Sequence, residues 1–277
     1  MTITDAQVHI WQANTLERPH IKEDASKPHQ PVPLTYERLL GAMNGAGVDR
    51  VILVPPSWDG YRNDYALEAA QKYPDRFAVM GKVPLNDPAS KDRLPTWLSQ
   101  PGMKGFRVSF RHSGTHSFLD DGTADWFWAD CERYDIPVMI FAPFAVAAIG
   151  KIAERHPRLR VIVDHMGLNI QWKGKDLTPG VDLLLTFARL PNVAVKASCL
   201  PCYVAEYYPF PTLHPQIRSV VDAFGPQRIM WGTDLSQSPV SYRQNVTLFT
   251  EELNFLSASD KEWIMGKSLA HWLRWPV

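Results

Sequence analysis

Two polar side chains close to the N-terminus have a spacing that suits chemistry. Gln7 and His9 stand two residues apart in the segment MTITDAQVHIW, whose loose alternation of apolar and polar residues predicts a short strand over residues 3–10. Alternate side chains of a strand point to the same face, so we expect the two groups side by side. Two histidines at this spacing would indicate metal ligands. With a glutamine in the first place, the pair leaves open whether it marks an active site and whether a metal binds there.

Further polar and titratable residues lie at or just beyond the ends of later apolar segments. They are Arg107, Arg111, Asp164, His165, Lys196, Ser198, Thr233 and Asp234. Such groups gathered on one rim of an apolar scaffold would indicate chemistry. Whether they share a rim depends on the elements that carry them.

Eight β-rich apolar segments recur along the chain, with amphipathic stretches between them. Nearly continuous apolar segments are typical of parallel strands buried on both faces, and the amphipathic stretches are typical of helices. This alternation predicts an α/β fold, a single (β/α)8 TIM barrel that forms one domain over residues 1–277. The predicted strands cover residues 3–10, 51–55, 77–85, 103–110, 136–143, 159–166, 193–199 and 228–235. The predicted helices cover residues 63–73, 123–134, 145–156, 180–190 and 216–225.

A barrel of this kind places its reacting groups at the carboxyl ends of the strands and in the loops that follow. Two long segments without periodicity follow strands here. Residues 14–34 are rich in proline and charge, and residues 200–215 are rich in aromatic residues and proline. Long loops are usually functional, so we expect both to border the site.

The composition excludes several kinds of partner. Lys plus Arg and Asp plus Glu number 29 each, so the formal net charge is zero, whereas nucleic acids and anionic membranes attract a basic excess. No apolar run approaches the length of a membrane-spanning helix, and the N-terminus lacks the pattern of a signal peptide. Three cysteines suit a reducing cytoplasm, and the lone CxxC of Cys199 and Cys202 favours packing over a zinc or redox site. We expect a cytoplasmic protein with a small-molecule substrate, and its oligomeric state stays open.

The order of three motifs resembles the amidohydrolase superfamily. They are DxQxHxW over residues 5–11, VDHMG over 163–167 and WGTD over 231–234. The resemblance is greatest to the branch of amidohydrolase-related lactonases, which includes the 2-pyrone-4,6-dicarboxylate lactonase and the sugar-lactone hydrolases. It extends over PDRFAVMGKVPLNDP (74–88), GMKGFRVSF (102–110), DIPVMIFAP (135–143), ERHPRLRVIVDHMG (154–167) and the tail IMGKSLAHWLRW (264–275).

The resemblance implies roles for the residues at the strand ends. Asp234 is expected to act as the general base that takes a proton from the attacking water and later returns it to the leaving group. His9 and His165 are expected to polarise the carbonyl or to hold a metal. Arg107, in the motif GFR, is expected to bind a carboxylate or the developing oxyanion through its fork of donors.

Gln7 departs from the family pattern, which has histidine at both positions of the first strand. A neutral amide oxygen is a poor ligand for zinc, so the substitution should weaken metal binding. Some members of the lactonase branch work without a metal, and Gln7 and His9 would then donate hydrogen bonds to the carbonyl oxygen. We therefore favour a metal-free or weakly metal-binding site. The alternative is a single divalent ion, zinc or manganese, held by His9, His165 and Asp234.

The second departure concerns the substrate. The pyrone lactonase binds a dicarboxylate with several arginines, one of them just after DHMG, where this chain has Leu168. Only Arg107 and Arg111 remain as candidate anion clamps. Aromatic residues near the rim favour a less charged, cyclic substrate. The candidate contacts are Trp11, Tyr61, Phe141 and Tyr203.

Three functions remain open. The first is a hydrolase that opens a lactone or a similar cyclic ester. The second is a metal-dependent decarboxylase of an aromatic or muconate-type acid, as in a related branch of the superfamily, against which Gln7 counts. The third is a barrel that binds a small molecule without catalysis, against which the presence of His165, Asp234 and Arg107 counts.

Overall fold

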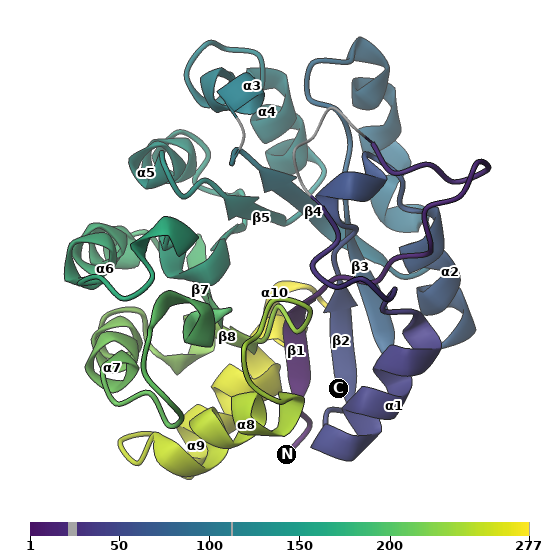
Figure 1. Ribbon diagram of the computed structural model, residues 1–277. Coiled ribbons are helices and arrows are strands. Elements are labelled where there is room, and N and C mark those ends of the chain that lie inside the picture. The colour runs from purple at the N-terminus through teal and green to yellow at the C-terminus, as the bar shows by residue number, and fades with distance from the viewer. Residues whose placement is uncertain (22–26, 112, 277) are drawn as a thin grey trace.

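In the computed structural model, which describes residues 1–21, 27–111 and 113–276, the eight predicted strands form one parallel sheet (Figure 1). Each strand pairs with the next along the chain, and helices surround the strands. The strands are β1 (Thr4–Val8), β2 (Arg50–Leu53), β3 (Phe77–Gly81), β4 (Met103–Ser109), β5 (Val138–Phe141), β6 (Val161–Val163), β7 (Val193–Ser198) and β8 (Ile229–Gly232). The predicted (β/α)8 barrel is confirmed.

The barrel closes between β8 and β1 mainly through the side chain of Asp5. Its Oδ1 accepts hydrogen bonds from the backbone N–H groups of Gln7 (3.0 Å) and Thr233 (2.9 Å). Its Oδ2 accepts from the hydroxyls of Thr233 (2.6 Å) and Tyr242 (2.9 Å). The backbone N–H of Asp234 also donates to the carbonyl of Gln7 at 2.9 Å. A buried carboxylate thus links the strand that carries His9 to the strand that carries Asp234.

The helices occupy the connections between strands. They are α1 (Tyr36–Ala46), α2 (Asp64–Lys72), α3 (Ser113–His116), α4 (Asp125–Arg133), α5 (Val146–Arg155), α6 (Thr178–Leu185), α7 (Leu213–Phe224), α8 (Tyr242–Thr247), α9 (Ala258–Glu262) and α10 (Ser268–Trp272). All five predicted helices are present, although the one over 180–190 changes into a 3-10 turn after Leu185. The connection between β3 and β4 is also 3-10 in character, because Pro95 interrupts it and cannot donate a helical hydrogen bond.

Two apolar layers hold the barrel together. One lies between the strands and the surrounding helices. The other fills the barrel interior and is closed at the amino end of the strands by the C-terminal segment, with Trp272 and Trp275 packed against it. Because apolar side chains close that end, a polar site can form only at the opposite end, where the strands lead into their loops.

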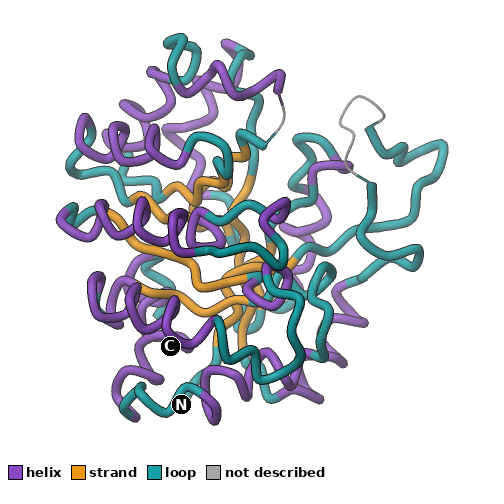
Figure 2. Tube along the Cα trace, turned by 60° about the vertical axis from the view of Figure 1, so that its left-hand side comes forward, coloured by secondary structure: helices purple, strands orange, loops and turns teal. Residues whose placement is uncertain are grey.

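The long segment after β1 lies over this opposite end and contacts neighbouring loops (Figure 2). Ile21 donates its backbone N–H to the carbonyl of Trp58 at 2.8 Å, and His29 contacts Ser236, beyond β8, at 2.8 Å. Of the predicted long loop 14–34, residues 22–26 lie outside the described residues. No helix in the described part of the chain has the length and apolar character that crossing a membrane requires.

Candidate active site

The polar residues predicted at the strand ends come together at the carboxyl end of the barrel. His9, Arg107, His165 and Asp234 are all nearly inaccessible to solvent, with at most 6% of each residue exposed, and they line one pocket. Beneath them, Gln7, Asp164, Lys196, Ser198 and Thr233 are completely buried. The sequence-based expectation of a shared rim is therefore correct.

Unusual backbone conformations direct two of these side chains. His165 and the next residue, Met166, both have φ of 53°, and Asp234 has φ of 52°. This left-handed region is uncommon for residues other than glycine and is concentrated at functional sites. His165 and Asp234 each stand two residues beyond the end of a strand, and both side chains line the pocket.

An ion-pair network lies below the pocket. Asp164 accepts from Arg107 Nε at 3.0 Å and forms an ion pair with Lys196 Nζ at 2.7 Å. Burial alone would raise the pKa of Asp164, but the two cations outweigh it and hold the pKa below its usual value. Asp164 therefore stays ionised and orients the guanidinium of Arg107, whose Cζ lies 5.2 Å from the ring centre of Phe141.

The same lysine fixes the orientation of Gln7. Lys196 Nζ donates to Gln7 Oε1 at 2.5 Å, and a lysine offers no acceptor. The amide nitrogen of Gln7 must therefore face His9, whose Nε2 lies 3.2 Å away. His9 Nδ1 lies 2.7 Å from the carbonyl of Val54 and donates to it. His9 consequently carries its proton on Nδ1, and its Nε2 presents a lone pair to Gln7 and to the pocket.

His165 is held in a similar way. Its Nδ1 lies 2.8 Å from Ser198 Oγ, and its Nε2 lies 3.9 Å from Asp234 Oδ2. Burial lowers the pKa of His9 to about 3 and that of His165 to about 4, although neighbouring carboxylates oppose the shift. Both imidazoles are therefore neutral at neutral pH.

Asp234 stands between the two histidines. Its Oδ2 accepts from Gln237 Nε2 at 2.6 Å, whereas its Oδ1 is buried, makes no hydrogen bond and lies 3.4 Å from His9 Nε2. Burial raises the pKa of Asp234, but the electrostatic interactions with His9, His165, His29 and Arg107 lower it by more, so the net shift is downward. An ionised carboxylate with one oxygen free is the geometry of a general base.

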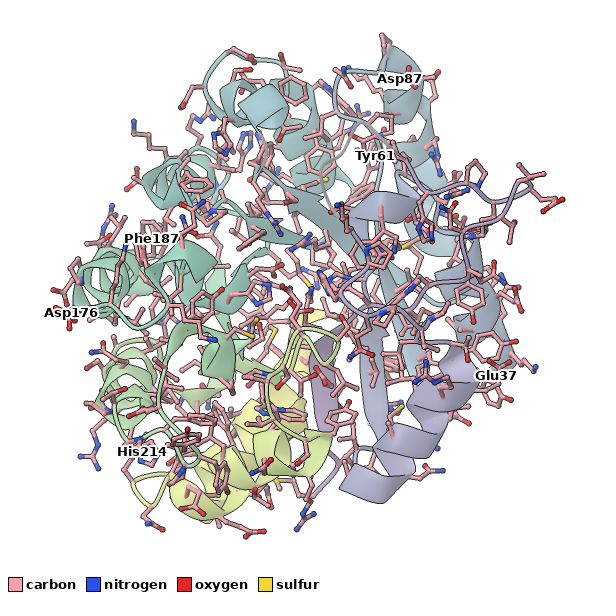
Figure 3. The ribbon with its side chains drawn as sticks, viewed as in Figure 1. Glu37, Tyr61, Asp87, Asp176, Phe187 and His214 are labelled. Carbon is pink, nitrogen blue, oxygen red and sulfur yellow. The ribbon has the colours of Figure 1, made fainter. Side chains whose placement is uncertain are left out.

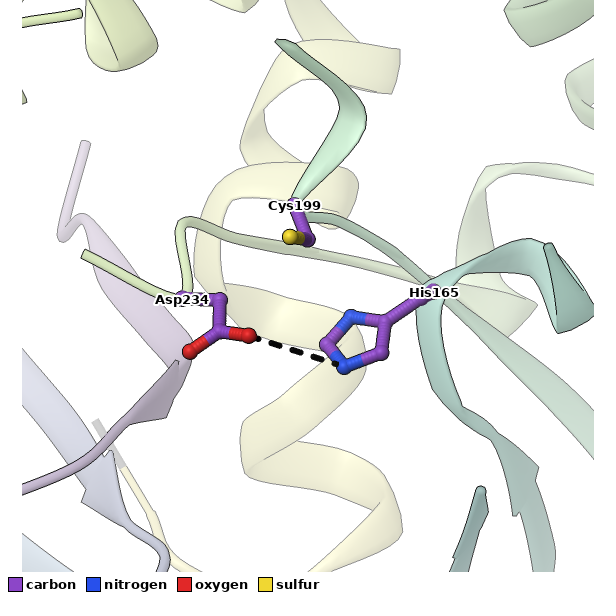
Figure 4. Close-up of side chains that lie close together, drawn as sticks. All are labelled: His165, Cys199 and Asp234. Carbon is purple, nitrogen blue, oxygen red and sulfur yellow. Dashed lines mark ion pairs between the residues drawn. The ribbon is translucent and has the colours of Figure 1, made fainter. Parts of the chain in front are cut away.

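The same groups have the chemistry of a metal site. The Nε2 atoms of His9 and His165 lie 3.4 and 3.9 Å from the carboxylate oxygens of Asp234. The Nδ1 of each imidazole has a partner of its own, as in histidines that ligate metals. Figure 4 shows His165, Asp234 and Cys199 close together, with ligand atoms of these three within 4.8 Å of one another. Gln7 cannot contribute its oxygen, because Lys196 occupies it.

The predicted substrate contacts separate into two groups. Arg111, Phe141 and Tyr203 line the pocket. Trp11 does not line it: it is buried behind Trp58, with the two ring centres 5.3 Å apart. Tyr61 does not line it either and is 49% exposed (Figure 3). The pocket volume is about 50 Å³, so lining side chains must move to admit a substrate.

Sequence reasoning missed five residues that line the pocket. They are His29, Ser57, Ser109, Cys199 and Gln237. Gln237 could have been found from its place three residues after Asp234, within the loop that follows β8. His29 carries no such signal, because its segment reaches the pocket only through contacts with distant loops.

Comparison with known proteins places this architecture among hydrolases. The chain is 27% identical over 238 residues to the 4-sulfomuconolactone hydrolase of Hydrogenophaga intermedia, covering 84% of this chain and 74% of that protein. It is 25% identical over 238 residues to the L-fucono-1,5-lactonase of Burkholderia ambifaria, covering 83% and 79%. A γ-resorcylate decarboxylase of Rhodococcus jostii is 25% identical over 219 residues, covering 62% and 64%.

Solved structures show the same fold. A crystal structure of an amidohydrolase from Burkholderia multivorans with bound zinc superposes with a TM-score of 0.82 at 21% identity, over 100% of both chains. The sequence profile of the Amidohydrolase family matches residues 4–268 of this chain, which span all eight strands. The chain therefore belongs to the amidohydrolase family and is a hydrolase.

Proposed function

We propose that this enzyme opens a lactone or a similar cyclic ester, with Asp234 as the general base. The observation that carries the proposal is the free, buried Oδ1 of an ionised Asp234, held between two neutral histidines with Arg107 across the pocket. The names of the two lactone hydrolases to which the chain is similar support the substrate class.

The residues divide the work of hydrolysis between them. Asp234 takes a proton from water as the water oxygen bonds to the carbonyl carbon, and it returns that proton to the ring oxygen when the carbon–oxygen bond breaks. Arg107, fixed by Asp164, turns its remaining N–H groups to the oxyanion. Gln7 does not line the pocket and its amide faces His9, so the role we assign to it is to orient His9 rather than to polarise the carbonyl itself.

Gln7 alone indicates weak metal binding, but the other residues of the site form a donor set that fits a divalent metal. His9 Nε2, His165 Nε2 and Asp234 would hold it, and catalytic zinc sites commonly use three protein ligands. When bound, the ion would supply a Lewis acid to the carbonyl group. Cys199, which also lies close, is a candidate fourth ligand. Metal dependence is therefore a separate arm of the test.

The pocket walls favour a substrate with few charges. Within the described residues that line the pocket, the cationic side chains are Arg107 and Arg111, whereas Trp58, Phe141 and Tyr203 contribute aromatic surface. A substrate with one carboxylate or one sulfonate would match this set of cations. A dicarboxylate would leave one anion without a partner, since Asp164 already engages Arg107.

The second candidate is decarboxylation of an aromatic acid, favoured by the similarity to a γ-resorcylate decarboxylase. The two candidates differ in their products. A lactonase releases a ring-opened acid and a proton, and a decarboxylase releases carbon dioxide.

The test is turnover of a panel of lactones by chelator-treated protein of known metal content, followed with a pH indicator. We expect ring opening by the wild type and a loss of at least about a hundredfold in Asp234→Asn, because the amide cannot accept the proton. Activity restored by added zinc or manganese would identify a metal enzyme. Carbon dioxide release from an aromatic acid, with no lactone opened, would refute the proposal.

A further inference from the structure

His29 is a pocket residue that comes from outside the strand ends. It lies on the segment after β1 and lines the pocket together with the residues of the strand ends. Its Nδ1 lies 2.8 Å from Ser236 Oγ, and the neighbouring Gln30 donates to the carbonyl of Ser236 at 3.3 Å. Its ring packs edge-on against Trp58 with centres 4.8 Å apart. These contacts fix a loop histidine in a defined place.

One nitrogen of this pocket-lining ring has no hydrogen-bond partner among the described residues. Within residues 1–21, 27–111 and 113–276, His29 Nε2 makes no hydrogen bond, because Ser236 engages only Nδ1. A serine hydroxyl can donate as well as accept, so Nδ1 can accept from Ser236 while Nε2 carries the proton. Burial lowers the pKa of His29, and in the neutral tautomer with its proton on Nε2 the ring donates one hydrogen bond from that atom.

The position of His29 relative to the other polar groups determines what it would contact. The His29 ring lies 5.7 Å from that of His9, and its anchor Ser236 follows Asp234 by two residues. His29 therefore sits over the β1–β8 edge, beside the general base. Arg107 comes from β4, on the opposite side of the barrel, and its guanidinium packs over the ring of Phe141 of β5. The carbonyl carbon of a bound lactone has its carbonyl oxygen and its ring oxygen on different sides. A lactone bound with its carbonyl oxygen toward Arg107 has room to turn its ring oxygen toward the β1–β8 edge, where His29 lies.

We propose that His29 Nε2–H donates a hydrogen bond to the ring oxygen of the substrate and stabilises it as the leaving group. The inference rests on the proposed lactone hydrolysis. The bond between water oxygen and carbonyl carbon forms, the bond between carbonyl carbon and ring oxygen breaks, and its electron pair goes to the ring oxygen. The proton that Asp234 removed from water ends on that oxygen. His29 supplies a hydrogen bond and loses no proton, so the reaction balances without it.

The test compares His29→Leu with the wild type over cyclic esters that differ in the acidity of the leaving group. The series is built on whichever ring the wild type opens: ring-substituted dihydrocoumarins, or an enol lactone and its saturated counterpart. A hydrogen bond to the departing oxygen matters most when that oxygen becomes most basic. We expect kcat to fall about tenfold for the poorest leaving group and less than about twofold for the best.

Three further variants separate this role from a structural one. His29→Gln keeps a donor and should recover part of the kcat for poor leaving groups. Ser236→Ala removes the anchor and should shift the dependence in the same direction as His29→Leu. His20→Leu alters a histidine of the same segment that lies outside the pocket and bonds to the carbonyl of Gln12 at 3.2 Å, and it should leave the dependence unchanged.

The outcomes distinguish the two proposals. An equal loss of kcat across the whole series in His29→Leu, or a change confined to KM, would overturn the leaving-group role while lactone hydrolysis stands. A wild type that opens no cyclic ester would overturn the proposed function, and the inference about His29 with it.

Discussion

Asp5 gives the most specific test of how the barrel closes. Both of its carboxylate oxygens are used at the seam between β1 and β8, and it is fully buried. Burial raises the pKa of Asp5 to about 6, against the lowering effect of its hydrogen bonds to Thr233, Gln7 and Tyr242. A carboxyl group that binds its proton more tightly in the folded state favours folding as the pH falls.

The magnitude follows from the difference between the pKa of about 6 in the folded protein and the ordinary aspartate value of 3.8 in the unfolded chain. Each pKa unit corresponds to about 1.4 kcal/mol, so the free energy of unfolding should gain up to about 3 kcal/mol between pH 7.5 and pH 4 from this group. His9 and His165 act in the opposite direction. Because burial lowers their pKa values, their contribution to stability is present above the unfolded pKa of 6.5 and is lost as the pH falls toward about 3 and 4.

Comparison of the wild type with Asp5→Asn cancels the pH dependence that His9 and His165 contribute, because both proteins share it. The asparagine oxygen can still accept from the backbone N–H groups of Gln7 and Thr233, and its amide can donate to the hydroxyls of Thr233 and Tyr242. The variant keeps the geometry but does not titrate. Urea unfolding of both proteins from pH 4 to 7.5 should show the wild type gaining stability relative to the variant as the pH falls. Parallel curves, or a relative gain as the pH rises, would refute the reasoning.

Three further predictions concern the pocket and its support. Lys196→Met leaves Asp164 with Arg107 as its remaining cation and should lower the free energy of unfolding by about 3 kcal/mol in urea titrations; an unchanged midpoint would contradict a role for the pair. Arg107→Lys keeps a cation near Asp164 but loses the planar fork of donors. The kcat on the accepted lactone should therefore fall about a hundredfold, with little change in the melting temperature. A fall in kcat that is accompanied by a large fall in the melting temperature would contradict the role of Arg107 at the oxyanion. Metal-free protein titrated with zinc should bind one ion per chain. The variants Asp234→Asn and His165→Ala should each bind zinc more weakly than the wild type. If the variants bind zinc as tightly as the wild type, the metal site lies elsewhere.

The strands could be predicted because their composition is dictated by burial on both faces. A parallel strand inside a barrel has no solvent face, so Val161–Val163 is entirely apolar and Val193–Ser198 begins with three apolar residues. Helix α1 gave a weaker signal, because Gly41 and Gly45 interrupt its periodicity. Its ends are nonetheless defined by the Thr35 cap and by Gly47, whose φ of 77° suits glycine.

The site could be predicted only as far as it follows strand ends. His9, His165 and Asp234 follow from their positions in the strands, and the alternation of elements brings them together. The partners of these residues do not follow from position. They depend on side-chain directions across the barrel interior. Two examples are the contacts of Lys196 with both Asp164 and Gln7 and the packing of Trp11 against Trp58. His29 reaches the pocket by tertiary contact alone.

The hydrogen bond from Lys196 to Gln7 also constrains how this site can change over evolution. The two residues are 189 positions apart in the sequence, on strands β1 and β7, which β8 separates in the closed barrel. A histidine introduced at position 7 would lie against the buried ammonium group of Lys196, which would keep Asp164 but lose the acceptor that Gln7 supplies, so we expect that replacing Gln7 alone would not recover a two-histidine ligand pair. Regaining that pair requires both positions to change together. Glutamine at position 7 and lysine at position 196 should therefore be inherited as a unit, and aligned relatives that have one without the other should be rare.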